Sequence, residues 1–211
     1  MFKESKMSTA KVCIQGVRPL FWHVFGREAI PLEGQRKEKT GVAGNDPEEW
    51  RRTTSVTKDG QLYLAGTYAF STITAGSKFI KKGRGSIQAD VNSTLQIADN
   101  RILVDRYFPG FPNGHEFDIT KVDAPPEDPD LPVYLDVRAV VNPSTKGRNV
   151  RYRIVASPGW KTEFTIDFDN TLVSDNQIHA ATRDAGKFIG IGNARKIGMG
   201  RFEVVSFEVI K

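Results

Sequence analysis

The segment Gly190–Phe202 combines glycines and cations in a pattern that suits phosphate binding. It reads GIGNARKIGMGRF. Glycine permits positive φ and lets a ligand approach backbone N–H groups closely. Arginine and lysine supply the donors that phosphate oxygens prefer. The sequence therefore predicts a nucleic-acid contact here, made by Gly192, Arg195, Lys196, Gly198, Gly200 and Arg201. The alternative is a glycine-rich connection that binds nothing.

The elements on either side of this segment argue against a nucleotide cofactor. A helix is expected from Ser174 or Asp175, with Ile178, Ala181 and Ala185 on one face and Gly190 as its end. A strand is expected from residue 201 to 210. Dinucleotide-binding loops follow a strand and open a helix, and a P-loop needs Gly-Lys-Ser/Thr. Because this loop follows a helix and opens a strand, we expect no cofactor.

Two further basic segments are predicted to contact phosphate. The net charge is +5, and the cations are clustered, which favours a polyanionic partner. One cluster follows a helix expected at 67–80, and the other is a turn between strands whose Arg151 and Arg153 should face outward. The clusters consist of Lys81, Lys82 and Arg84, and of Lys146, Arg148, Arg151 and Arg153. The alternatives are favourable contact with a helix dipole for the first cluster and a solvated hairpin tip for the second.

Catalytic signals are weak. The histidines are far apart in sequence, no Cys/His cluster has metal-ligand spacing, and no G-x-S-x-G motif is present. Asp46 is the one candidate for metal-dependent cleavage, but Asn45 or Asp46 also suits the N-cap of a helix with Pro47 at its first position. We expect a binding protein without a metal, and cleavage stays an alternative.

The order of expected elements predicts an α+β fold. Strands are expected at 10–22, 60–66, 134–141, 150–154, 160–169 and 201–210, helices at 67–80 and 174–190, and a β-hairpin at 86–106. This order matches a ferredoxin-like (RRM-like) β-α-β-β-α-β core. We expect a single domain, 1–211, with insertions at about 23–58 and 86–132, the second ending in a proline-rich stretch.

The bulk features favour a cytoplasmic protein. Cys13 has no second cysteine to pair with, which fits a reducing compartment. The N-terminus lacks a signal-peptide core, and no run of apolar residues is long enough to cross a membrane. We therefore expect no membrane partner.

A resemblance appears in the glycine-rich segment. A helix followed by G-x-G-x-x-x-x-x-G-x-G-R-F and a last strand resembles the RAMP superfamily of CRISPR-associated RNA-binding proteins. Residues 62–68, LYLAGTY, resemble the strand-to-helix entry of its crRNA-backbone subunits. Ala65 and Thr67 depart from the Ile-Pro-Gly-Ser-like sequence there. The resemblance covers the outline of residues 10–80 and 160–207.

The resemblance implies a function in antiviral defence. It implies a non-catalytic subunit that packs side by side along single-stranded guide RNA (crRNA), as a homo-oligomer or in a multi-subunit ribonucleoprotein. The hairpin at 86–106 would then be thumb-like. Three alternatives stay open: a phage-type single-stranded DNA-binding protein, a small RAMP-type endoribonuclease, and an assembly protein whose basic surface meets another protein.

Overall fold

A computed structural model describes residues 5–24, 46–110, 119–141 and 146–210. The chain forms two compact units. The first, here the sheet unit, contains Met1–Leu20, Tyr63–Asp105 and Pro158–Lys211, and the second unit contains Phe21–Leu62 and Arg106–Ser157. The second unit covers the first expected insertion, whereas its other segment begins near residue 106 instead of 86. The single domain with two insertions stays a prediction.

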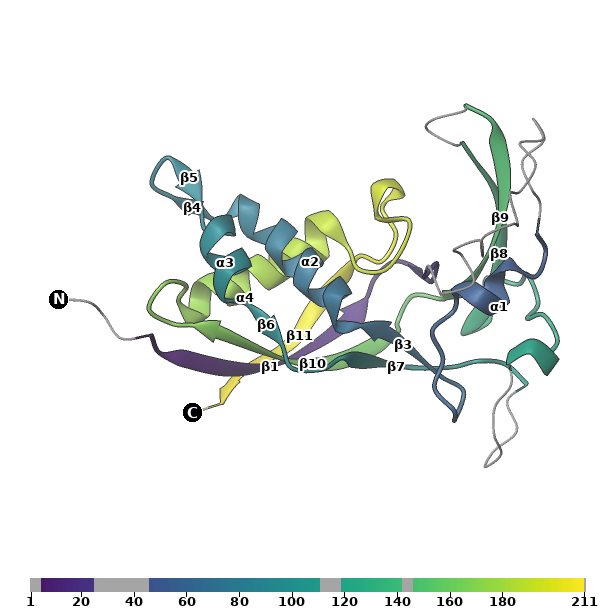
Figure 1. The fold of residues 1–211 in the computed structure, drawn as a ribbon, viewed down its shortest axis with the longest axis horizontal. Coiled ribbons are helices and arrows are strands. Elements are labelled where there is room, and N and C mark those ends of the chain that lie inside the picture. Colours follow the sequence, from purple (N-terminus) through teal and green to yellow (C-terminus); the bar gives the residue numbers. More distant parts are fainter. Residues whose placement is uncertain (1–4, 25–45, 111–118, 142–145, 211) are drawn as a thin grey trace, which may run out of the picture. The chain divides into compact units, whose positions relative to one another are not determined.

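The sheet unit is built on a six-stranded sheet in the order β11-β1-β10-β7-β3, with β6 also paired to β10. β1 pairs antiparallel with both β10 and β11 (Figure 1). The register shifts once, between Cys13 and Ile14, where Val205 of β11 forms a bulge. The strands are β1 Met7–Gly16, β3 Gln61–Ala65, β6 Gln96–Ile97, β7 Arg101–Tyr107, β10 Lys161–Asp169 and β11 Phe202–Ile210.

Alternation along the central strands fixes which face of the sheet is buried. Ala10, Val12 and Ile14 of β1 are fully buried, and so are Ile166 and Phe168 of β10. The residues between them are exposed or half-buried. Because side chains alternate between the two faces of a strand, this pattern puts the apolar set on one face. The expected strands at 160–169 and 201–210 are confirmed.

Helices cover that apolar face, as Figure 1 shows. They are α2 Gly66–Gly76, the 3-10 turn η2 Ser77–Phe79, α3 Gln88–Thr94, α4 Asp175–Asp184 and the π-helical turn η4 Ala185–Ile189. Ser174 caps α4 in a capping box with Gln177, as its position predicted. A Cβ on Gly76 would lie 2.5 Å from the carbonyl oxygen of Ala181, so this glycine lets α2 and α4 touch.

The prediction of a β-hairpin at 86–106 was wrong. Ile87, Val91 and Leu95 are buried at helical spacing, and α3 occupies Gln88–Thr94. β6 pairs antiparallel with β10 around Ile97 and Ile166, and β7 pairs antiparallel with the same strand around Val104 and Thr162. The two strands therefore run in one direction along β10 and do not fold back on each other.

The second unit contains a three-stranded sheet in the order β2-β9-β8. β8 and β9 pair antiparallel over their whole length and confirm the strands expected at 134–141 and 150–154. Trp50 of α1 stacks on Phe108 with ring centroids 5.4 Å apart. The elements are β2 Leu20–Phe21, α1 Glu49–Thr53, the 3-10 turn η3 Ile119–Lys121, β8 Val133–Val141 and β9 Arg148–Ala156. Within the described ranges, no helix is long and apolar enough to cross a membrane.

Asp169 ends β10 in a dense set of hydrogen bonds. Its carboxylate accepts from the Ser5 hydroxyl at 2.7 Å, from the Thr171 hydroxyl at 2.6 Å and from the Thr171 N–H at 2.8 Å. The hydrogen bond from the Thr171 side chain is the largest cause that lowers the pKa of Asp169 to about 2, followed by the one from Ser5. Donors of this kind stabilise the charged form.

Because the pKa of Asp169 is depressed in the folded state, we predict that ionisation of this carboxylate makes the stability of the fold depend on pH in the acid range. The ordinary pKa is 3.8 and the folded value about 2, so the stabilisation is present above pH 3.8 and is lost as the pH falls toward 2. The free energy of unfolding of the wild type should therefore fall more steeply over that range than that of Asp169→Asn. Urea titrations at several pH values measure this, and parallel pH profiles would contradict the assignment.

Candidate nucleic-acid interface

The glycine-rich loop stands on a narrow neck of backbone contacts in the sheet unit. The Ile191 N–H donates to the Gly200 carbonyl at 2.8 Å, and the Gly200 N–H donates to the Pro19 carbonyl at 2.8 Å. Gly200 has φ +67°, and a Cβ there would lie 1.8 Å from the Ile191 carbonyl oxygen. Gly190 has φ +82°, and a Cβ would lie 2.5 Å from the Met199 carbonyl oxygen. These two glycines are required by the neck itself.

The outer part of the loop is a compact turn. The 3-10 turn η5 spans Arg195–Ile197 between two left-handed residues, Ala194 and Gly198. The N–H groups of Ile197, Gly198 and Met199 all donate to carbonyls within this turn. The backbone donors expected to face a ligand are therefore in part committed to the turn, and its side chains are the groups left to contact phosphate.

Arg195 and Lys196 lie together on this turn. Lys196 is exposed and Arg195 half-buried, and no ion pair involves either within the described ranges. Burial raises the pKa of Tyr68 on α2, and the positive charge of Arg195 opposes that rise. The buried Thr72 hydroxyl donates to the Gly190 carbonyl at 3.1 Å. The base of the loop is thus bonded to α2 through Gly190, and no acid in the described residues pairs with the two cations of the turn.

Arg201 does not join Arg195 and Lys196. Its carbonyl accepts from the Val17 N–H at 2.8 Å and from the Arg18 N–H at 3.2 Å. Its side chain lines a cleft with Arg18, Arg183 and Lys187. Those three cations were missed by the sequence analysis because they are scattered along the chain. Arg201 and Arg195 are close in sequence, but that closeness did not indicate which cations share a surface.

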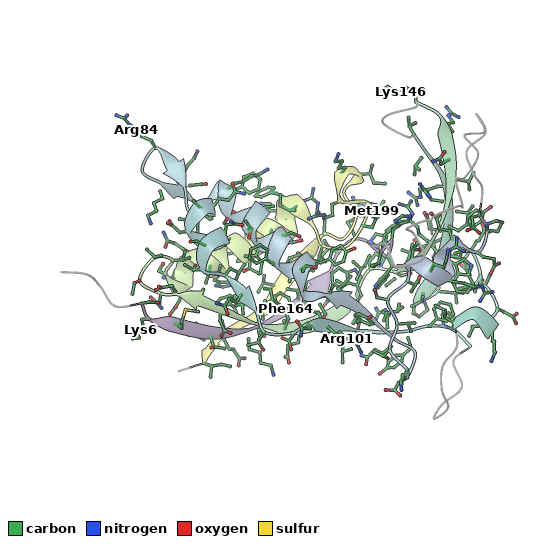
Figure 2. All side chains as sticks on the ribbon, viewed as in Figure 1. Lys6, Arg84, Arg101, Lys146, Phe164 and Met199 are labelled. Carbon is green, nitrogen blue, oxygen red and sulfur yellow. The ribbon has the colours of Figure 1, made fainter. Side chains whose placement is uncertain are left out.

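The cations after α2 lie on a separate projection of the sheet unit. Lys81, Lys82 and Arg84 are exposed on a short hairpin made of β4 Lys81–Lys82 and β5 Gly85–Ser86, and Lys82 pairs with Asp90 at 2.8 Å. Figure 2 places Arg84 at one end of the helical layer, apart from Met199 in the glycine-rich loop. The structure does not bring these two predicted contacts together.

The cations of the second unit divide into exposed and structural groups. Lys146 and Arg148 are exposed near the tip of the β8–β9 hairpin. Arg151 pairs with Glu49, and Arg153 is only 5% exposed and pairs with Asp136 at 3.3 Å. The expectation that Arg153 faces outward was wrong.

The burial of Arg153 has a local physical cause. Its guanidinium lies 4.9 Å from the centroid of the Phe21 ring, and burial lowers its pKa. Opposing this, Asp136 favours the charged form. Alternation alone predicted a polar residue on a polar face, whereas cation–π contact and an ion pair hold this arginine inside.

Asp46 has structural partners. Its carboxylate accepts from the Glu48 N–H at 3.1 Å and pairs with Arg52. The helix that follows begins at Glu49, with Glu48 as its N-cap; Asn45 lies outside the described residues. Among the described residues, no group of three or more His, Cys, Asp or Glu is arranged to hold a metal ion. These contacts give Asp46 a structural role at the start of α1.

The uncovered face of the sheet is not a basic platform. On β10 it carries Lys161, Glu163 and Asp167, and Glu163 pairs with Lys11 of β1 at 2.8 Å. The exposed Glu203 and Glu208 of β11 add further negative charge. Like charges would repel phosphate here, so the helix-covered side and its loop are the better place for a nucleic acid.

Comparisons with known proteins find similarity to solved structures and to no family model or curated protein. The chain is similar to a chain in a solved structure described as "Cryo-EM structure of the Type III-B Cmr-beta bound to cognate target RNA", with a TM-score of 0.47 and 13% identity. The match covers 98% of this chain and 61% of that chain. A TM-score below 0.5 at this identity does not define a shared fold.

The neck predicts very different costs for two glycine substitutions. Gly200→Ala adds a steric clash to an unfavourable φ, so it should lower the free energy of unfolding by roughly 3–4 kcal/mol. Gly198→Ala is the matched control: φ is +82°, but nothing lies within 4 Å of the added Cβ. Its cost should be about 1–2 kcal/mol. Urea denaturation measures both, and equal losses would show that the close approach at Gly200 does not stabilise the neck.

Proposed function

We propose that this chain is a non-catalytic, RAMP-like subunit that binds single-stranded RNA through backbone phosphates. The observation that carries the proposal is the η5 turn, where Arg195 and Lys196 stand on a sterically fixed neck with no acidic partner among the described residues. A preorganised pair of cations loses little conformational freedom when it meets phosphate. Contacts of this kind position a nucleic acid and carry no sequence information.

The strand order supports a ferredoxin-like core for this subunit. Along the chain, β1, α2, β7, β10, α4 and β11 follow the β-α-β-β-α-β order. In the sheet, β11 and β10 flank β1, and β7 lies beyond β10. In this assignment β3 extends the sheet at its edge, and β6 continues the line of β7 along β10.

The charge distribution supports phosphate contact on the helix side of the sheet. Lys81, Lys82 and Arg84 are exposed there as well, and would meet a different part of a long strand than the η5 turn does. Lys146 and Arg148 are further candidates in the second unit. From the RAMP resemblance we infer that the bound RNA is a guide-like RNA. We also infer that the chain assembles with copies of itself or with other protein subunits, in the cytoplasm.

Neutralising the η5 turn tests the proposal. Arg195→Gln/Lys196→Gln should weaken binding of a single-stranded RNA roughly tenfold, because the two substitutions remove charge-assisted hydrogen bonds to phosphate. The slope of log K against log salt should fall by up to ~0.7 for each phosphate that is no longer neutralised. Fluorescence anisotropy at several salt concentrations measures both quantities.

The matched control removes two cations from the uncovered sheet face. Lys11→Gln/Lys161→Gln changes the net charge by the same amount and should leave affinity and slope near the wild-type values. Equal weakening by both pairs would contradict a localised site and show only an effect of total charge. A parallel titration with DNA of the same sequence separates an RNA-binding protein from the phage-type single-stranded DNA-binding alternative.

A further inference from the structure

A cleft in the sheet unit gathers cations that no sequence cluster contains. It has a volume of about 620 Å³ and lies where the segment after β1, the end of α4, the η4 turn and the start of β11 meet. Arg18, Arg183, Lys187 and Arg201 line it, and the acidic residues among its lining are Asp184 and Glu203. The lining therefore has an excess of positive charge.

These four cations have no acidic partner in the part of the chain that the structure describes, where no ion pair joins any of them to a carboxylate. One terminal nitrogen of Arg201, Nη1, is buried and has no hydrogen-bond partner among the described residues. Burial also lowers the pKa of Arg201, because a partly buried guanidinium loses some of its hydration.

The backbone holds these cations in place. The Val17 and Arg18 N–H groups donate to the Arg201 carbonyl, which ties the two arginine-bearing segments together. A Cβ on Gly186 would lie 2.2 Å from the Phe202 carbonyl oxygen, so glycine lets η4 touch the start of β11. Apolar side chains of Val17, Phe202 and Val204 complete the lining.

We propose that this cleft binds the phosphate group of a nucleotide, with the arginines around the phosphate and the apolar lining against its sugar or base. Guanidinium groups suit phosphate oxygens because they present planar, paired donors. The cleft is much larger than one phosphate ion, which leaves room for the attached nucleoside. An anion would also supply the partner that Arg201 lacks. This site is separate from the η5 turn and does not depend on the loop's contact with RNA.

Arg183 and Lys187 could also stabilise the helix that carries them, and this structural role has to be distinguished from ligand binding. Both lie near the end of the α4–η4 helix, where cations interact favourably with the helix dipole. A purely structural role predicts that their removal lowers stability and leaves nucleotide affinity unchanged. Arg18 lies outside any helix, so Arg18→Gln tests the cleft without this complication.

Calorimetric titration of the full chain with adenosine 5′-monophosphate and with adenosine tests the proposal. The nucleotide should bind at least roughly tenfold more tightly than the nucleoside, since only the nucleotide makes charge-assisted contacts. Arg18→Gln and Arg183→Gln/Lys187→Gln should each weaken nucleotide binding several-fold, because each variant removes donors to the phosphate. Lys161→Gln is the exposed-cation control and should bind like the wild type.

The outcomes distinguish this site from the loop and identify the source of the phosphate. Arg195→Gln/Lys196→Gln should leave the affinity for the mononucleotide unchanged even if it abolishes RNA binding. A dinucleoside monophosphate that binds equally well assigns the cleft to internal phosphodiesters; failure of that probe alone assigns it to a terminal phosphate. Equal binding of nucleotide and nucleoside, or wild-type affinity in folded cleft variants, would overturn the proposal. So would binding of hexaglutamate by a protein that does not bind the mononucleotide.

Discussion

The close approach of Gly200 to the Ile191 carbonyl is the constraint on which the candidate binding surfaces of the sheet unit depend. No other residue fits there, because a Cβ would overlap the carbonyl oxygen at 1.8 Å. The same glycine donates to Pro19, so the end of the last helix, the segment after β1 and the start of β11 meet at one point. The η5 turn projects from this point on one side, and Arg201 continues from it into the cleft.

This constraint changes how the glycines of the loop are understood. Their spacing first indicated a backbone cradle for phosphate. The structure gives Gly190 and Gly200 a steric reason that needs no ligand, whereas Gly198 needs only its left-handed conformation. The phosphate-binding argument therefore rests on cationic side chains. Arg195 and Lys196 lie on a turn that is already folded, so their side chains would lose little conformational freedom on binding phosphate.

Much of the fold was predictable where local and tertiary signals agree. The Ser174 capping box, the helix end at Gly190 and the alternating strands β10 and β11 all appear where expected. The prediction for 86–106 was wrong because weak alternation and a turn signal favoured a hairpin, while Ile87, Val91 and Leu95 pack as one helical face against the core. Packing outweighed local preference there, and a single sequence does not show packing partners.

The candidate sites were less predictable than the fold because charge acts through space. Arg151 and Arg153 look like free cations in sequence, yet Arg151 pairs with Glu49 from a distant segment and Arg153 pairs with Asp136, which lies opposite it on β8. Arg18, Arg183 and Lys187 look incidental, yet they line one cleft with Arg201. The number of cations in a segment is therefore a poor guide to where an anion would bind. The absence of an acidic partner is a better guide.

The same reasoning explains how a chain of modest net charge can orient on a polyanion. Acidic side chains of β10 and β11 lie on the uncovered sheet face, and exposed cations lie on the hairpin and turn of the helix side. A molecule charged in this way meets a strand of phosphates with one side attracted and the other repelled, so the field selects an orientation before any contact forms. Neutralising the acidic face would raise the net charge and the affinity at low salt, and it would weaken the selection of orientation, because only the uneven distribution of charge provides that selection.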